Sequence, residues 1–231
     1  MDCNFTDGKI LLFNKPYVWT SFDLVRKVKF LLQNKLKLKK LKVGHAGTLD
    51  PLASGLLIVC TGKFTKKIDL IQAQPKEYIA TIKLGATTPS FDLETEIDQE
   101  FPFEHISDLM IFEKLKNFIG EQEQIPPIFS AKRVDGKRAY EYARSGEELI
   151  MKPSHITIYD MEMLEYNAPI LKVRVACSKG TYIRSLARDI GISLNSGGHL
   201  TNLVRTKIGD YSVENAMSID DFEKQIQDCI S

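Results

Sequence analysis

The sequence predicts a mixed α/β fold, in which a mixed sheet is flanked by helices and loops. Apolar or alternating segments typical of strands are interleaved with segments of helical periodicity. Several of the predicted strands follow one another directly, without a helix between them. A doubly wound parallel sheet needs a crossover connection between its strands, so the mixed sheet is favoured.

The first half of the chain is predicted to alternate between strands and helices. Residues 10–14 (ILLFN) and 56–60 (LLIVC) are apolar runs typical of strands, and residues 77–84 (EYIATIKL) alternate like a half-buried strand. Thr20-Ser21 supplies N-cap chemistry for a helix. The apolar stripe of this helix is expected to be Phe22, Val25, Val28 and Leu32. A second helix is expected near residues 63–72, with Phe64, Ile68 and Ile71 on one face.

The middle of the chain is predicted to be less regular. Residues 85–105 are polar and acidic without periodicity, which indicates a long loop. A helix from about Ser107 to Ile119 follows, and Gly120 ends it. Its expected packing residues are Leu109, Phe112, Leu115 and Phe118. The segment of about 120–150 combines prolines with basic residues and is the candidate for an inserted subdomain.

The last part of the chain returns to strands and helices. Strands are expected at 155–165 and 170–177, and a turn then leads into a helix at 181–190. A Gly-Gly loop, a strand near 208–213 and a helix capped by Ser218 complete the chain.

Length and composition limit the class of protein. With 231 residues the chain allows one or two domains and a substantial core. No apolar run approaches the ~18 residues of a membrane span, and the N-terminus does not resemble a signal peptide. The four cysteines lie far apart without a C-x-x-C pair, so neither a zinc site nor a disulfide framework is indicated. We therefore expect a cytoplasmic protein with reduced thiols.

The net charge is only +1, but a lysine run at residues 35–42 (KLKLKKLK) concentrates positive charge, whereas acids gather at 92–104 and near the C-terminus. The lysine run is either a solvated loop or an electrostatic footprint for phosphates. The sequence leaves both interpretations open, and the run's position directly before the loop described next favours the second.

Residues 42–57 (KVGHAGTLDPLASGLL) form a loop whose backbone conformation is restricted by its glycines and its proline. Its glycines permit backbone angles that side chains would block, and Pro51 pushes Asp50 towards an extended conformation. An acid held in this way is a candidate for chemistry. Taken alone, an Asp before a Pro is more often a turn or cap residue, and His45 and Asp50 lack the further partners that a metal site needs.

The loop resembles the signature of the TruB-type tRNA pseudouridine synthases, G-H-x-G-x-L-D-P-x-A-x-G, in which the acid is catalytic. Other blocks of the family match in the same order along nearly the whole chain. They are residues 10–16 (ILLFNKP), 76–85 (KEYIATIKLG), 126–144 (PPIFSAKRVDGKRAYEYAR), 177–185 (CSKGTYIRS) and 198–205 (GHLTNLVR).

The resemblance implies a pseudouridine synthase fold, a largely antiparallel sheet, over residues 1–231 as one catalytic domain. The implied enzyme is an isomerase that converts the T-loop uridine at position 55 of tRNA to pseudouridine. Because the product is an isomer of the substrate, no cofactor, metal or cosubstrate is expected. The expected partner is the T stem-loop of tRNA, held partly by the insertion at about 120–150, and we expect a monomer that binds no membrane.

The same resemblance assigns roles to the catalytic residues. Asp50 would be the nucleophile or the group that activates the glycosidic bond. Arg184 would pair with Asp50 and keep it ionised, and Tyr182 would line the base and could move a proton. Without the resemblance, Arg184 reads as a surface arginine and Tyr182 as a helix residue packed on the sheet.

Other residues are implied in substrate binding. Tyr78 would stack on the flipped base, His45 would hold the flipped nucleotide, and Leu203 would close the pocket. Without the resemblance, Tyr78 would be interpreted as a core residue and His45 as a core or turn residue. Lys15 and Arg205 would support the site or contact phosphate, and the sequence leaves a solvated surface position equally open for both.

The chain departs from the family pattern at three places. Position 46 is Ala where the family usually has Thr, and Asp92 is only a loose match to the family's acid. The chain ends about 25 residues after Arg205, so we expect no separate C-terminal RNA-binding domain of the PUA type.

Two other functions remain to be weighed: a tRNA-binding chaperone in which Asp50 is structural, and a carboxylate-dependent hydrolase. Asp50, Tyr78, Tyr182 and Arg184 together disfavour the first, because binding alone needs only a basic surface. The absence of a second paired acid disfavours the second.

Overall fold

A computed structural model shows that the chain folds as two compact units. The first unit runs from the N-terminal region to Tyr78 and resumes at Leu203, and the second comprises Ile79–Asn202. The structure describes residues 4–37, 40–130, 132–134, 136–145, 147 and 149–228. Within these residues, no helix is long and apolar enough to cross a membrane.

The first unit is built on three principal strands. Its elements are β1 (Ile10–Lys15), α1 (Ser21–Lys35), β2 (Val43–His45), β3 (Ala53–Thr61), the 3₁₀ helix η1 (Gly62–Lys67), α2 (Ile68–Ala73), the start of β4 (Lys76–Leu84), the end of β12 (Gly198–Ile208), β13 (Tyr211–Ser212), η2 (Val213–Asn215) and α6 (Ile219–Asp228). Strand β3 lies between β1, which is antiparallel to it, and β12, which is parallel to it. Strand β2 pairs with the far end of β3.

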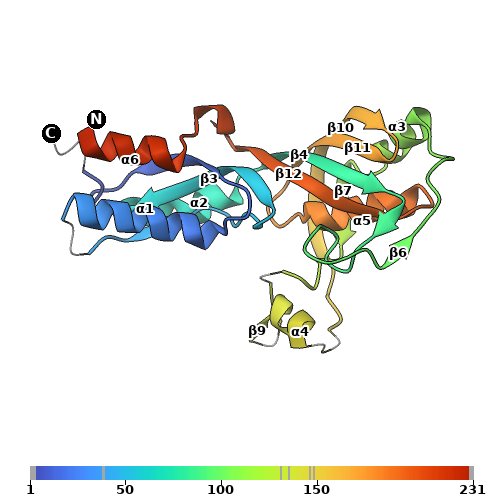
Figure 1. Cartoon of the computed structure of the whole chain (residues 1–231), viewed down its shortest axis with the longest axis horizontal. Coiled ribbons are helices and arrows are strands. Elements are labelled where there is room, and N and C mark those ends of the chain that lie inside the picture. Colours follow the sequence, from blue (N-terminus) through green and yellow to red (C-terminus); the bar gives the residue numbers. More distant parts are fainter. Residues whose placement is uncertain are drawn as a thin grey trace. The chain divides into compact units, whose positions relative to one another are not determined.

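The core of the first unit lies on both faces of β3. Residues 56–60 are fully buried, as expected of a strand covered on both sides. On one face they meet Ile71 and Ile208, with Phe64 and Ile68 packed beside them. On the other, α6 inserts Phe222, whose ring lies edge-on to Phe13 at 5.1 Å. Helices α1 and α6 run next to each other (Figure 1).

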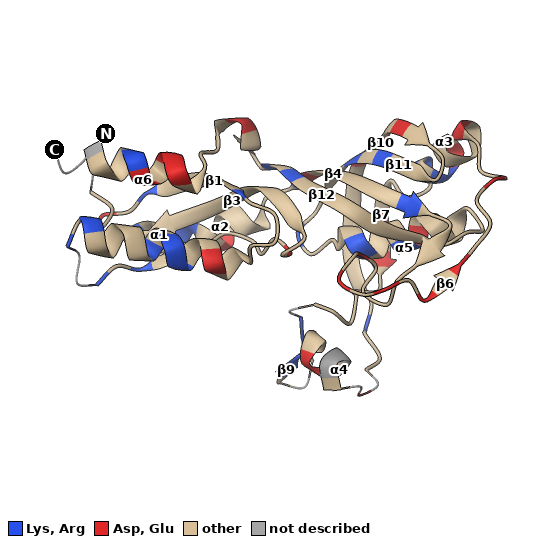
Figure 2. Ribbon diagram, viewed as in Figure 1, with Lys and Arg blue, Asp and Glu red and all other residues tan. Residues whose placement is uncertain are grey.

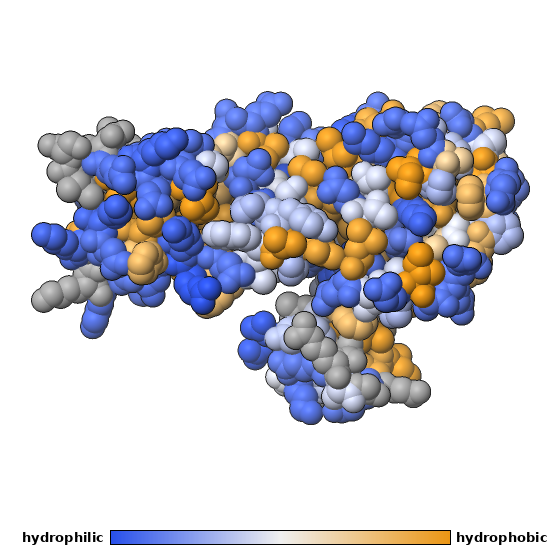
Figure 3. Space-filling view, viewed as in Figure 1, coloured by the Kyte–Doolittle hydropathy of each residue, from blue (hydrophilic) through white to orange (hydrophobic). Residues whose placement is uncertain are grey.

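Helix α1 begins as the sequence predicts but turns a different face to the core. Thr20 caps it, and Asp23 returns the contact to the Thr20 backbone in a capping box. Its buried residues are Ser21, Leu24, Val25, Val28, Leu31 and Leu32. The prediction that Phe22 belongs to this stripe was wrong, because Phe22 is 68% exposed. Figure 3 shows apolar residues among the hydrophilic ones that dominate the drawn face of α1.

The second unit contains the long antiparallel hairpin of the sheet. Its elements are the rest of β4, β5 (Ala86–Thr87), β6 (Gln99–Glu100), α3 (Asp108–Lys116), β7 (Gly120–Gln124), β8 (Arg133–Val134), β9 (Lys137–Arg138), α4 (Ala139–Ser145), β10 (Ser154–Asn167), β11 (Ile170–Cys177), α5 (Ile183–Ser193) and the start of β12. The strand order is β4-β11-β10-β7, and the β10 pairs are antiparallel. Strand β11 alternates as predicted, with Leu171, Val173, Val175 and Cys177 fully buried.

The mixed α/β class with a mainly antiparallel sheet is thus confirmed, while further elements besides α1 differ from expectation. The long loop expected at 85–105 contains the two-residue strands β5 and β6. In α3 the buried residues are Ile111 and Leu115, whereas Leu109 and Phe112 are exposed. The strand expected near 208–213 is instead the end of β12, a turn and the two-residue β13. Strand β12 starts ten residues earlier, directly at Gly198.

Candidate active site

Asp50 lies in the connection between β2 and β3, at the point where β3 begins. The amide N–H of Ala53 donates to the Asp50 carbonyl at 3.1 Å, which closes a turn with Pro51 in its second position. Proline at this position fixes the backbone angle that the turn requires. Asp50 is partly buried and lies three residues before β3, a strand whose residues are all buried except Ser54.

Arg205 holds the Asp50 loop from the side of β12. Its side chain is 1% exposed, and its guanidinium donates to three backbone carbonyls: Leu56 at 2.8 Å, Gly47 at 3.1 Å and Thr48 at 3.1 Å. A buried charge is tolerated only when it is hydrogen-bonded in this way. The exposed position that the sequence left open for Arg205 is therefore wrong, and its observed contacts fit the supporting role.

The close approach of β12 explains the glycine at position 55. Arg205 is the register partner of Gly55, whose φ is +103°. A β-carbon on residue 55 would come within 2.8 Å of the Arg205 backbone nitrogen, closer than real contacts allow. Only glycine lets β12 pack here, and so only glycine allows Arg205 to reach the Asp50 loop.

Ser21 and Lys15 hold the same loop from α1 and β1. The Ser21 hydroxyl accepts from the Leu49 N–H at 2.8 Å and donates to the Leu49 carbonyl at 3.0 Å. The Lys15 ammonium donates to the carbonyls of Pro16 at 2.9 Å, Trp19 at 2.5 Å and Pro51 at 3.3 Å. The residues on both sides of Asp50 are thereby fixed. Sequence reasoning missed Ser21, because it predicted only N-cap chemistry there.

Arg205, Ser21 and Lys15 together form the frame of the Asp50 loop, and burial determines the electrostatics of this frame. Lys15 is fully buried, which lowers its pKa to about 8, although the negative charge of Asp50 acts in the opposite direction. The exposed alternative for Lys15 is therefore also wrong. Burial, with a smaller contribution from the Arg205 charge, lowers the pKa of His45 and favours the neutral imidazole at neutral pH.

Two further predicted residues lie in the first unit. Leu203 on β12 is buried and pairs in register with Ala53, three residues after Asp50. Tyr78 on β4 is also largely buried. The structure thus places Lys15 and His45 at the ends of β1 and β2, and Leu203 and Arg205 within β12 beside the start of β3.

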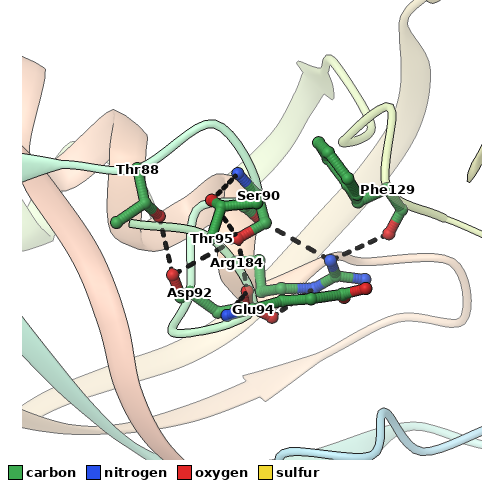
Figure 4. A network of polar contacts seen from close by, with 7 residues as sticks. All are labelled: Thr88, Ser90, Asp92, Glu94, Thr95, Phe129 and Arg184. Carbon is green, nitrogen blue, oxygen red and sulfur yellow. Dashed lines mark hydrogen bonds and ion pairs between the residues drawn. The ribbon is translucent and has the colours of Figure 1, made fainter. Parts of the chain in front are cut away.

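The second unit holds Arg184 in a separate polar network (Figure 4). The Arg184 guanidinium forms an ion pair with Asp92 at 3.6 Å and donates to the Phe129 carbonyl at 2.8 Å. Both charged side chains are buried. Arg184 is therefore an interior residue, so the surface position that sequence alone suggested for it is wrong.

Asp92 is organised by its own loop. Its carboxylate accepts from the Ser90 hydroxyl at 2.6 Å and the Glu94 N–H at 2.9 Å, and its carbonyl accepts from the Thr88 hydroxyl at 2.7 Å. These bonds fix a carboxylate that in turn orients Arg184. The loose match of Asp92 to the family's acid was the one signal in the sequence for this partner.

Tyr182 is positioned by Gln124, a residue that sequence reasoning missed. The buried Gln124 amide accepts from the Tyr182 N–H at 2.8 Å and donates to the Tyr182 carbonyl at 3.1 Å. Tyr182 is the N-cap residue of α5 and has no side-chain cap of its own. The two residues lie 58 positions apart, so no local pattern could have revealed the pair.

The same segment holds the next residues of α5. The Ser185 hydroxyl donates to the Ile125 carbonyl at 2.8 Å, and Arg184 binds Phe129 as described above. The first part of the predicted insertion therefore holds three positions at the start of α5. The predicted pair of Asp50 and Arg184 joins residues of different units and stays a prediction.

The predicted insertion at about 120–150 contains β7, the β8–β9 hairpin and α4. Lys132 donates to the Ser154 hydroxyl at 2.6 Å, whereas Arg133, Lys137 and Arg138 lie on the hairpin. Lys137 lies over the Tyr142 ring. Of the lysine run at 35–42, residues 38 and 39 lie outside the described part of the chain. Among the described residues, no group of three or more His, Cys, Asp or Glu could hold a metal ion.

Comparison with known proteins identifies the family. Residues 33–183 match the N-terminal domain of the TruB family pseudouridylate synthases, and residues 184–229 match the tRNA pseudouridylate synthase B C-terminal domain. The chain belongs to the TruB family. As a TruB-family pseudouridine synthase it is an isomerase. The resemblance noted from its motifs is confirmed, and so is the enzyme class.

Curated relatives match over most of the chain. A protein of Parabacteroides distasonis named tRNA pseudouridine synthase B is 60% identical over 96% of both chains. Proteins of the same name from Flavobacterium johnsoniae and Clostridium kluyveri are 57% and 44% identical over 96% and 93% of this chain, and over 98% and 71% of their own lengths. The TruB-family assignment therefore covers both units.

Solved structures support the fold of this TruB-family chain. In a Cbf5-Nop10-Gar1 complex, one chain is 27% identical, with a TM-score of 0.71 over 98% of this chain and 58% of its own. In the archaeal box H/ACA sRNP Nop10-Cbf5 complex the match is 25% identical, with a TM-score of 0.69 over 96% of this chain and 55% of that one. The pseudouridine synthase fold predicted from the resemblance is thus confirmed.

Proposed function

We propose that this enzyme isomerises the T-loop uridine at position 55 of tRNA to pseudouridine, with Asp50 as the nucleophile. The name shared by relatives of up to 60% identity supports tRNA as the substrate. The observation that supports the role of Asp50 is the frame of hydrogen bonds around its backbone. Arg205, Ser21 and Lys15 fix the backbone on both sides of this acid through hydrogen bonds to Thr48, Leu49 and Pro51.

The reaction breaks the bond between C1′ of the ribose and N1 of uracil and forms a bond between C1′ and C5. The proton lost from C5 is balanced by the one gained at N1, so substrate and product have the same composition. Asp50 would attack as a carboxylate and leave again, or stabilise positive charge on the sugar. No redox partner, metal or cosubstrate is consumed by such an isomerisation.

The uridine must leave its stack to reach Asp50, at a cost of roughly a few kcal/mol. Stacking on Tyr78, contact with a neutral His45 and closure by Leu203 would offset this cost. The lowered pKa of His45 supports its role, because a neutral imidazole can both donate and accept a hydrogen bond. Lys15 and Arg205 act behind the site by holding the loop.

In the same proposal, Arg184 pairs with Asp50 and Tyr182 lines the base and moves a proton. The rigid support of both residues favours this assignment: Asp92 and Phe129 orient Arg184, and Gln124 holds the Tyr182 backbone. Pre-positioned groups lose no freedom when the substrate arrives, which is why catalytic side chains are supported in this way.

The proposed partner is the T stem-loop, bound by a cytoplasmic monomer in which residues 1–231 act as one catalytic domain. The insertion at about 120–150 would hold the stem through the cations of its hairpin, because phosphate contacts dominate the affinity for RNA. The direct attachment of this insertion to the start of α5 supports a role near the catalytic residues.

Mapping of pseudouridine tests the proposal. Wild-type enzyme is incubated with full-length tRNA and with an isolated T stem-loop, in the presence of EDTA, and the product is located by chemical sequencing. We expect modification at position 55 in both RNAs and none when that uridine is replaced by cytidine. Modification at another position, or none at all, would contradict the substrate assignment.

A further inference from the structure

A groove of about 590 Å³ on the first unit gathers lysines from three separate elements. It lies between the end of α1, the last residues of the lysine run and η1. The lysines that line it are Lys29, Lys40, Lys42, Lys63 and Lys66. Figure 2 shows lysine and arginine along α1 and the chain that follows it.

Backbone hydrogen bonds hold the walls of this lysine groove together. The Gly62 N–H donates to the Lys42 carbonyl at 2.9 Å, which joins η1 to the end of the lysine run. The buried Thr61 hydroxyl donates to the Phe5 carbonyl at 2.9 Å, which joins the N-terminal segment to the same point. Gly62 has a φ of +52°, and a β-carbon there would lie 2.7 Å from the Phe5 oxygen. The fold therefore fixes the backbones that carry these lysines.

The charge of the lysine groove is strongly one-sided. Lys29, Lys40, Lys42, Lys63 and Lys66 are all exposed, and among the described residues that line the groove there is no carboxylate. Asp7 lies just outside and pairs with Lys63 at 2.8 Å. Like charges gathered in a concave surface repel one another and create a positive potential that attracts anions.

The lysine groove lies at the opposite end of β3 from Asp50. Asp50 precedes the first residue of β3, and Gly62 follows the last. A strand of this length spans roughly 30 Å at about 3.3 Å per residue. An anion in the groove is thus too far away to belong to the nucleotide at Asp50.

We infer that the lysine groove binds backbone phosphates of the tRNA outside the T arm. The inference rests on the proposed function and adds a second contact to it. Spaced ammonium groups on a fixed backbone suit a chain of phosphates, since each neutralised phosphate releases counterions and adds to the affinity. Such contacts position an RNA without reading its sequence.

Binding measurements with two RNAs test this inference. The variant Lys42→Gln/Lys63→Gln/Lys66→Gln should bind full-length tRNA at least tenfold more weakly, whereas its Kd for the isolated T stem-loop should not change. The slope of log Kd against log salt should fall by about 2 for full-length tRNA, because each phosphate contact contributes roughly 0.7–0.9. The rate of modification at saturating tRNA should stay at the wild-type value.

Two further variants sharpen the test. Lys114→Gln/Lys116→Gln/Lys224→Gln removes the same charge outside the groove and should leave both affinities nearly unchanged. Asp7→Asn frees Lys63 from its acidic partner and should strengthen tRNA binding. Wild-type affinity and slope in the groove variant would overturn the inference, as would an equal loss for the two RNAs. A wild-type enzyme that modifies neither RNA would instead refute the proposed function.

Discussion

At the scale of single residues, Val18 has an unexpected backbone conformation. Its φ is +64°, a region that a β-branched residue enters only under strain, and its side chain is 63% exposed. The reversal lies between Pro16 and Trp19, whose carbonyls both bind the Lys15 ammonium. The strain at Val18 therefore accompanies the wrapping of this loop around a buried charge.

Replacing Val18 with glycine is expected to stabilise the protein. The left-handed conformation costs an L-residue roughly 1–2 kcal/mol, whereas glycine adopts it freely, at some cost in entropy. We expect the Val18→Gly variant to raise the free energy of unfolding by about 1 kcal/mol in urea titrations. Val18→Ala keeps a β-carbon and should give a smaller gain. A Val18→Gly variant less stable than wild type would contradict the strain at this position.

Lys15 makes stability depend on pH in a defined direction. Its pKa is about 8 in the folded protein and 10.5 ordinarily, so between these values the unfolded chain keeps a proton that the folded protein has lost. Raising the pH through this window therefore favours the fold, by about 1.4 kcal/mol for each unit of pKa difference. Below pH 8, Lys15 is protonated in both the folded and the unfolded state, so the folded protein bears the full free-energy cost of burying this charge.

The comparison with Lys15→Met isolates this effect from other titrating groups. The free energy of unfolding of wild type minus that of the variant should rise by a few kcal/mol between pH 8 and pH 10.5. Chemical denaturation at a series of pH values measures it. A difference that stays constant or falls across this window would contradict a lowered pKa of Lys15 in the folded protein.

At the scale of elements, the start of α5 depends on a strand far away in sequence. Gln124 of β7 holds both backbone groups of Tyr182, so we expect Gln124→Met to lower kcat at least tenfold with little change in KM. The isosteric methionine keeps the volume but neither hydrogen bond. Steady-state kinetics with tRNA at a temperature well below the midpoint of unfolding measures the effect.

Gln122 offers a matched control on the same strand. Its amide donates to the Phe118 carbonyl at 2.6 Å, away from α5. The Gln122→Met variant should therefore keep its kcat even though it also loses a hydrogen bond to a backbone carbonyl. Equal losses in both variants would mean that β7 supports the fold generally and does not position Tyr182.

Much of the element pattern could be predicted from periodicity, and the failures have physical causes. In α1 the core-facing position of the first turn belongs to Ser21, which binds Leu49, so the larger Phe22 points to solvent. In α3 the residues 109, 112 and 115 and the residues 111 and 115 both fit helical spacing, and tertiary packing selected the second set. Helical periodicity alone does not show which residues of α1 and α3 face the core.

The candidate site was predictable only in part. The motif located Asp50, but local patterns left Arg205 and Lys15 undecided between surface and interior. Their burial follows from partners 149 and 36 positions away, Leu56 for Arg205 and Pro51 for Lys15. Gln124 was missed for the same reason. Contacts of this kind are set by strand pairing, which a single sequence does not specify.

At the scale of the whole molecule, both units contribute residues to the proposed chemistry. The first unit contains Asp50 with its frame, and the second contains Tyr182 and Arg184 with theirs. The hydrogen bonds and the ion pair described above join residues of the same unit. The family match extends across both units.

The central claim is that Asp50 performs the chemistry and does not simply shape its loop. The direct measurement is the single-turnover rate of pseudouridine formation at position 55 of full-length tRNA by the Asp50→Asn variant, together with its Kd for the same RNA. Asparagine preserves the size of the side chain and removes the nucleophile. We predict no detectable product and a Kd within about twofold of wild type. Product formed at the wild-type rate would refute the nucleophilic role, and binding lost together with turnover would make Asp50 a structural residue.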